Sequence, residues 1–213
     1  MKLFIITCLL ATSATAALEW DQTEVNLQVH AVQLDADAVF RFKNTGRETI
    51  ALEDVKVTSG SLAPTLEKRA YAPGETGELK VRFDLRGRTG AQKKAVIVQT
   101  SAGATARLNI GVDIPKAYSV APIMMKWAET NAAPTKTAKL VSAAAEPIKL
   151  LAAVSSNPAV VVELKTLREG FEYEVVVTRP PAGENLRAVI RIHSEPPPGF
   201  TEGKALKFYV HAL

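Results

Sequence analysis

The segment that decides the fold class is YAPGETGELKVRFDLRGRTGAQKKAVIVQT, residues 71–100. Every second residue from Leu79 to Leu85 is apolar and the residues between are charged, which predicts a strand with one face in a core. Turn sequences flank this strand, and a second apolar strand follows at residues 94–98. The pattern therefore predicts an antiparallel hairpin in an all-β protein. The residues expected to shape this segment are Pro73, Gly74, Phe83, Gly87 and Gly90.

The order of elements around this segment occurs twice in the chain. Residues 50–98 run through a strand, a small polar turn, an alternating strand, a second turn and an apolar strand, and residues 148–192 repeat that order. The offset is roughly 95 residues, which is close to the length of one immunoglobulin-type sandwich. The sequence therefore predicts two tandem immunoglobulin-like β-sandwich domains, at residues 17–114 and 115–213, with Pro115 interrupting strand pairing between them.

Several residues outside the opening segment are predicted to be structural. Trp20 and Trp127 each lie near the start of one half, where core packing is expected, and Gly46 ends a turn after an alternating strand. The spacing Leu-x-x-Gly-x-x-Tyr at residues 167–173 is typical of a tyrosine corner. We therefore expect Gly170 and Tyr173 to be structural, with the Tyr173 phenol bonded back to backbone at an edge of the sandwich.

The N-terminus has the pattern of an export signal. A basic start, an apolar run and a small-residue motif ending at Ala16 predict a signal peptide at residues 1–16. The only cysteine, Cys8, lies inside it, so the mature chain would contain no disulfide and no thiolate site. No later apolar run is long enough for a transmembrane segment. We expect a secreted or periplasmic protein.

The distribution of charge and the spacing of histidine and serine residues narrow the possible classes of function. The formal charge of +4 is dispersed along alternating strands, which favours solvated sheet faces and argues against a nucleic-acid groove. The three histidines, His30, His193 and His211, are far apart, and Ser59-Gly-Ser61 lacks the frame of a nucleophile elbow. We therefore expect no catalytic, cofactor-binding or metal residues and no cofactor.

The turn motifs also carry a family resemblance. Phe42-Lys-Asn-Thr-Gly46, Pro73-Gly-Glu-Thr-Gly77 and Phe83-Asp-Leu-Arg-Gly-Arg-Thr-Gly90, in this order, resemble the bacterial "domain of unknown function 1573" family, which is similar to Hydin-like and major-sperm-protein-like immunoglobulin folds. The second half resembles a degenerate second module. Family members often carry Cys-Gly-Cys where this chain has Ser59-Gly-Ser61, so no role of those cysteines transfers to this chain. The resemblance implies an architecture and an exported context.

After nucleic-acid binding, metal binding and catalysis are disfavoured, surface recognition is the class of function that the sequence favours. The leading hypothesis is a non-enzymatic, exported protein that acts in protein interaction or cell-envelope organisation through sandwich edges and end loops. The alternatives are a carbohydrate-binding or enzyme-accessory module, and a hydrolase on a β scaffold. The partner would be a protein or another envelope component. The loops to test are residues 59–66, 180–185 and 195–203.

Overall fold

The computed structural model describes residues 18–127, 133–178 and 186–212, and every regular element in these ranges is a strand. The prediction of an all-β protein is confirmed. The strands are β1 (Leu18–Trp20), β2 (Glu24–Leu27), β3 (Asp35–Asn44), β4 (Ile50–Val57), β5 (Leu62–Leu66), β6 (Ala70–Tyr71), β7 (Thr76–Asp84), β8 (Gly90–Thr100), β9 (Thr105–Ile114), β10 (Tyr118–Ala121), β11 (Met124–Trp127), β12 (Thr135–Ser142), β13 (Leu150–Ser155), β14 (Val162–Arg168), β15 (Glu172–Thr178), β16 (Leu186–Ser194) and β17 (Leu206–Ala212).

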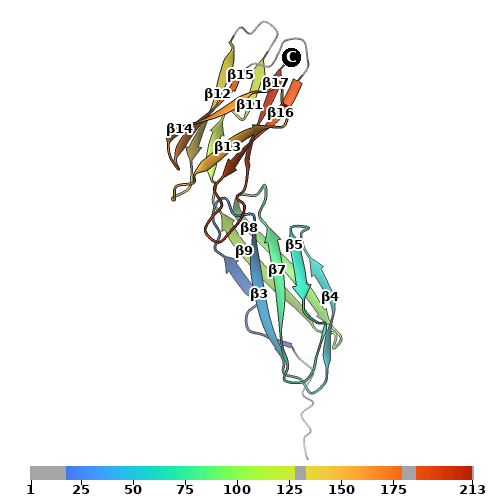
Figure 1. The fold of residues 1–213 in the computed structure, drawn as a ribbon. Coiled ribbons are helices and arrows are strands. Elements are labelled where there is room, and N and C mark those ends of the chain that lie inside the picture. Colours follow the sequence, from blue (N-terminus) through green and yellow to red (C-terminus); the bar gives the residue numbers. More distant parts are fainter. Residues whose placement is uncertain (1–17, 128–132, 179–185, 213) are drawn as a thin grey trace, which may run out of the picture. The chain divides into compact units, whose positions relative to one another are not determined.

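The strands form two β-sandwiches with the same strand order. In the first sandwich, the sheet β1-β3-β7-β5 packs on the sheet β2-β9-β8-β4-β6. In the second, the sheet β10-β12-β15-β14 packs on the sheet β11-β17-β16-β13 (Figure 1). Apart from the short β6, each strand of the first sandwich thus has an equivalent in the second. The predicted architecture of two tandem immunoglobulin-like sandwiches is confirmed.

Hydrogen bonds repeat at equivalent positions and fix the alignment of the two sandwiches. Asn109 N donates to Thr23 O (2.7 Å) between β9 and the residue before β2, and Tyr209 N donates to Ile123 O (2.9 Å) between β17 and the residue before β11. A side chain also repeats a bond, because Ala95 N donates to Thr58 Oγ1 (2.9 Å) and Val189 N donates to Ser156 Oγ (2.9 Å). Residue 109 is therefore equivalent to 209, and residue 95 to 189.

The hairpin predicted over residues 71–100 is wrong, although both of its strands exist. Strand β7 lies in the sheet β1-β3-β7-β5, whereas β8 lies in the opposite sheet beside β9 and β4. The segment 85–89 therefore crosses from one sheet to the other. Both strands turn apolar residues toward the same core, so the alternation is the same for a crossing connection as for a hairpin.

The first sandwich has an aromatic cluster at the end where β1 pairs with β3. The Trp20 and Phe42 rings lie 4.8 Å apart, and Phe42 makes an edge-to-face contact with Tyr71 at 4.8 Å. Beside them the buried Asn44 side chain donates to Glu48 O and Tyr71 O and accepts from Gly46 N, each at 2.8–2.9 Å. Asn44 therefore holds the turn that Gly46 completes, and Phe83 is fully buried farther along the same core.

The second sandwich has a core of equally buried apolar residues and a tyrosine corner. Trp127 is buried in this core, and Tyr173 Oη accepts hydrogen bonds from Gly170 N (2.8 Å) and Leu150 N (3.2 Å). The backbone bond expected from the spacing of residues 167–173 is therefore present. Tyr118 lies edge-on to Tyr173, and burial raises the pKa of the Tyr118 phenol. Other residues of this core are Leu140, Val175, Ile190 and Phe208.

Turns depend on glycine where the backbone is left-handed. Gly74, Gly87, Gly90 and Gly170 all have φ between +70° and +78°. At Gly170 a Cβ would lie only 2.4 Å from Pro147 Cβ, whereas the space at Gly74 is open. A side chain at residue 170 would therefore meet both steric and conformational obstacles.

The described chain also divides into two compact units. One contains residues 18–25, Asp37–Arg82 and Lys94–Ile110, and the other contains Asn26–Ala36, Phe83–Lys93 and the residues from Gly111 onward. This division passes through β2, β3, β7, β8 and β9. The domain boundary predicted between residues 114 and 115 stays a prediction.

Candidate protein-binding face

The loops selected from the sequence carry few groups for binding. In the loop before β5, the Ser59 and Ser61 hydroxyls lie 2.9 Å apart and bond to each other, and Ser61 is buried. The loop at residues 195–203 exposes Phe200. The loop at residues 180–185 lies outside the described residues. The most informative surface is on the second sandwich, on the outward face of the sheet β11-β17-β16-β13.

Cross-strand pairing arranges the outward residues of this sheet in three rows. Met124 of β11 pairs with Tyr209 of β17, which pairs with Val189 of β16. On one side of this apolar row lie Lys126, His211 and Arg187, paired in the same order. On the other side lie Lys207, Arg191 and Val154 from β17, β16 and β13. We call these nine residues the basic face.

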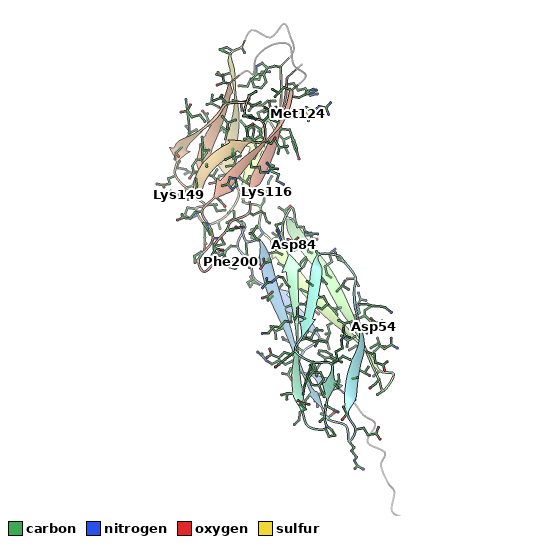
Figure 2. All side chains as sticks on the ribbon, turned by 45° about the vertical axis from the view of Figure 1, so that its right-hand side comes forward. Asp54, Asp84, Lys116, Met124, Lys149 and Phe200 are labelled. Atoms are coloured by element: carbon green, nitrogen blue, oxygen red, sulfur yellow. The ribbon has the colours of Figure 1, made fainter. Side chains whose placement is uncertain are left out.

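The apolar row of the basic face is exposed at Met124 and Tyr209 and half-buried at Val189. Met124 is 47% and Tyr209 44% exposed, and Ile123, just before β11, is 63% exposed. Met124 lies at the surface of the second sandwich in Figure 2. A shallow hollow of about 480 Å³ is lined by Met124, Tyr209 and Val189 together with Lys126, Arg187 and His211. An apolar floor with a cationic border therefore lies open to a partner.

The charges of this sheet all have one sign. Strands β11, β13, β16 and β17 contain no aspartate or glutamate, but they contain two lysines, two arginines and two histidines. Within the described ranges, no ion pair involves Lys126, Arg187, Arg191 or Lys207. The opposite sheet differs, because Lys139 pairs with Glu172 (3.7 Å) and Lys165 with Glu163 (3.7 Å). The basic face therefore has positive charge with no carboxylate on its own strands to offset it.

Most residues named in the sequence analysis lie outside the basic face, and His211 is an exception. Trp127 is buried and Trp20 packs on Phe42, so both tryptophans are packing residues. His193 and His211 are on the same sheet, whereas His30 lies outside it. Sequence reasoning treated the alternation Lys207, Tyr209, His211 as an ordinary solvated face. The missed signal was the lack of carboxylates in segments 150–155, 186–194 and 206–212, which acquires meaning once these strands are known to be neighbours.

Metal-binding clusters and membrane-spanning helices are both lacking in the part of the chain that the structure describes. These residues contain no group of three or more histidine, cysteine, aspartate or glutamate side chains placed to hold a metal ion. They also contain no helix with the length and apolar character needed to cross a membrane.

The first part of the chain matches a known protein family. The family model described as "Protein of unknown function (DUF1573)" matches residues 18–114. Residues 18–114 therefore match this family, and the family resemblance predicted from the sequence is confirmed there. None of the curated proteins compared with the chain matches it.

Solved structures that match the chain are distant in sequence. A protein of unknown function from Porphyromonas gingivalis W83 is 14% identical, with 92% of this chain and 98% of that chain covered and a TM-score of 0.37. The E. coli chaperone DraB is 13% identical over 91% and 95% of the two chains (TM-score 0.37). The ASH/PapD-like domain 7 of human CEP192 is 11% identical over 55% and 98% (TM-score 0.39).

Proposed function

We propose that the chain is a non-enzymatic interaction module that binds another protein through the basic face of its second sandwich. The observation that carries this proposal is the apolar row of exposed Met124, exposed Tyr209 and half-buried Val189 inside a border of lysine and arginine. Tyrosine, methionine and arginine are the residues enriched at protein interfaces. A central aromatic anchor surrounded by polar groups is also the usual arrangement of a binding hot spot.

The proposal shifts the expected binding region from edges and loops to a sheet face. The edge strand β11 contributes Met124 and Lys126, so an edge still takes part. Export to the cell envelope, which the predicted signal peptide at residues 1–16 favours, remains part of the proposal. N-terminal sequencing of the chain from fractionated cells tests it, and a chain that retains Met1 in the cytoplasmic fraction would contradict it.

A photo-crosslinking amino acid at position 209 tests the binding face directly. We expect a protein adduct from position 209 and none from position 109, which is the equivalent position of the first sandwich. Both variants have the same backbone hydrogen bond, so the comparison isolates the surface around each residue. No adduct at position 209, or equal adducts at both positions, would contradict the proposed function.

A carbohydrate-binding module is the second candidate because Tyr209 presents an exposed aromatic ring. Neither tryptophan supplies a comparable platform, since Trp127 is buried and Trp20 is packed against Phe42. A glycan array separates the two candidates. Binding to a neutral glycan that Tyr209→Ala abolishes would favour the carbohydrate-binding function.

A further inference from the structure

The basic face contains charge pairs that the fold alone does not favour. Arg191 and Lys207 lie directly opposite each other on neighbouring antiparallel strands. Like charges in this relation repel each other and destabilise a sheet. No aspartate or glutamate on these four strands offsets the repulsion. An anionic partner would remove it, because each of its carboxylates would lie near two cations.

The spacing of the rows defines the pattern of such a partner. Residues two apart on one strand face the same side about 6.7 Å apart, and an extended peptide repeats its own side chains at the same interval. Along β17 the order is Lys207, Tyr209, His211, and along β16 it is Arg191, Val189, Arg187. The complementary pattern is therefore carboxylate, apolar residue, carboxylate at positions i, i+2 and i+4.

We infer that the partner contributes an acidic polypeptide segment with the pattern Glu/Asp-x-apolar-x-Glu/Asp, which lies over the basic face with its apolar residue against Tyr209, Met124 and Val189. This inference rests on the proposed function and specifies the partner's chemistry. A uniform polyanion fits the face less well, because the central row carries no charge and is apolar across all three strands.

Titration of the isotope-labelled full chain with synthetic peptides tests the inference. The probe is a seven-residue peptide, Ser-Glu-Ser-Leu-Ser-Glu-Ser, and its controls replace both glutamates by glutamine or the leucine by serine. We expect the acidic peptide to shift the amide resonances of Arg187, Lys207 and Tyr209. We also expect at least tenfold weaker binding by the glutamine peptide, and at least tenfold weaker binding in 0.3 M than in 0.02 M salt, because exposed charges are screened.

Matched charge reversals show whether binding of the acidic peptide depends on the basic face or only on the net charge of the chain. Arg187→Glu/Lys207→Glu should weaken binding of the acidic peptide at least tenfold. Lys93→Glu/Arg107→Glu changes the exposed residues at the equivalent positions of β8 and β9 by the same total charge and should leave binding within twofold. If the first double variant fails to fold, Arg187→Gln/Lys207→Gln takes its place.

Four results would overturn the inference: no binding of the acidic peptide, equal binding of the glutamine peptide, equal losses in both double variants, or equal binding and equal shifts with dextran sulfate. An adduct at position 209 combined with any of these results would retain the proposed function and reject the acidic segment. Absence of the adduct would reject the proposed function itself.

Discussion

The two sheets β2-β9-β8-β4-β6 and β11-β17-β16-β13 share a backbone arrangement but differ on their outward faces. At the positions equivalent to Met124, Tyr209 and Val189, the first sandwich has Glu24, Asn109 and Ala95. The alignment rests on hydrogen bonds that both sandwiches form, so the difference lies in the side chains. An exposed apolar row is therefore not a requirement of this strand order.

The charges of the two sheets show the same contrast. On β4 of the first sandwich, Lys56 and Asp54 form an ion pair of 2.8 Å, and the hydrogen bond that Lys56 donates to Asp54 raises the pKa of Lys56. On the second sandwich, Lys207 lies opposite Arg191. Asp54 and Met124 mark the two sandwiches in Figure 2. The first face therefore contains carboxylates that balance its cations, whereas the second contains none.

The largest expected effect is the loss of stability when a buried residue on the inward face of either sheet is truncated. Phe208 and Leu108 are equivalent residues and are fully buried. Truncation of a buried side chain leaves a cavity, so Phe208→Ala should cost about 4 kcal/mol and Leu108→Ala about 3 kcal/mol of unfolding free energy. Urea titration followed by tryptophan fluorescence measures this, because Trp20 reports the first sandwich and Trp127 the second. Two variants that unfold at the wild-type midpoint would contradict the shared core.

Turn glycines provide the next comparison. Gly170→Ala should cost about 3 kcal/mol because the left-handed backbone disfavours a side chain and the new methyl group would clash with Pro147. Gly74→Ala meets only the backbone penalty and should cost about 1 kcal/mol. Thermal unfolding of both variants measures the difference. Equal losses would show that the contact with Pro147 relaxes without cost.

Sequence reasoning predicted the features that depend on local chemistry. The strand from Leu79 to Leu85, the tyrosine corner at Tyr173 and the left-handed glycines all follow from alternation or spacing within a few residues. The pairing of strands was harder to predict, because a strand packs the same apolar face on a core in either sheet. For this reason the hairpin was wrong, and the basic face, which combines four separate segments, was missed.

Charge reversals on the outward faces of the two sheets should change stability less than the core and glycine substitutions do. Lys207→Glu would place a carboxylate opposite Arg191, so it should raise the unfolding free energy by roughly 0.5 kcal/mol. Lys56→Glu removes the partner of Asp54 and should lower stability. Thermal melts of both variants in 0.02 M and 1 M salt measure the two signs and their screening.

The stabilities of the variants Lys207→Glu and Lys56→Glu also bear on the proposed function. If Lys207→Glu stabilises the chain while weakening binding of the acidic peptide, the wild-type lysine sacrifices stability for recognition. A loss of stability in Lys207→Glu that equals the loss in Lys56→Glu would show that the repulsion between Arg191 and Lys207 is absent.

The smallest expected effect is a difference between the two sandwiches in how much stability each loses at acid pH. In the first sandwich, the hydrogen bond from Arg82 to Asp37 (3.0 Å) holds the pKa of Asp37 below its ordinary value of 3.8. A carboxyl group whose folded pKa is lowered stabilises the fold fully above its unfolded pKa, and this contribution is lost as the pH falls through the folded pKa. Asp37→Asn should therefore reduce the loss of stability between about pH 5 and pH 2.

The measurement is an acid titration of the wild type and Asp37→Asn, in which amide resonances of β3 and β7 report the first sandwich and those of β16 and β17 report the second. We expect the variant to flatten the pH dependence at β3 and β7 and to leave the resonances of β16 and β17 unchanged. This result would follow because β3 and β7 carry the ion pair of Asp37 with Arg82, whereas β16 and β17 contain no carboxylate. Equal changes in both sandwiches would mean that the carboxylates act through net charge, and the ion pair of Asp37 with Arg82 would then have no local stabilising role.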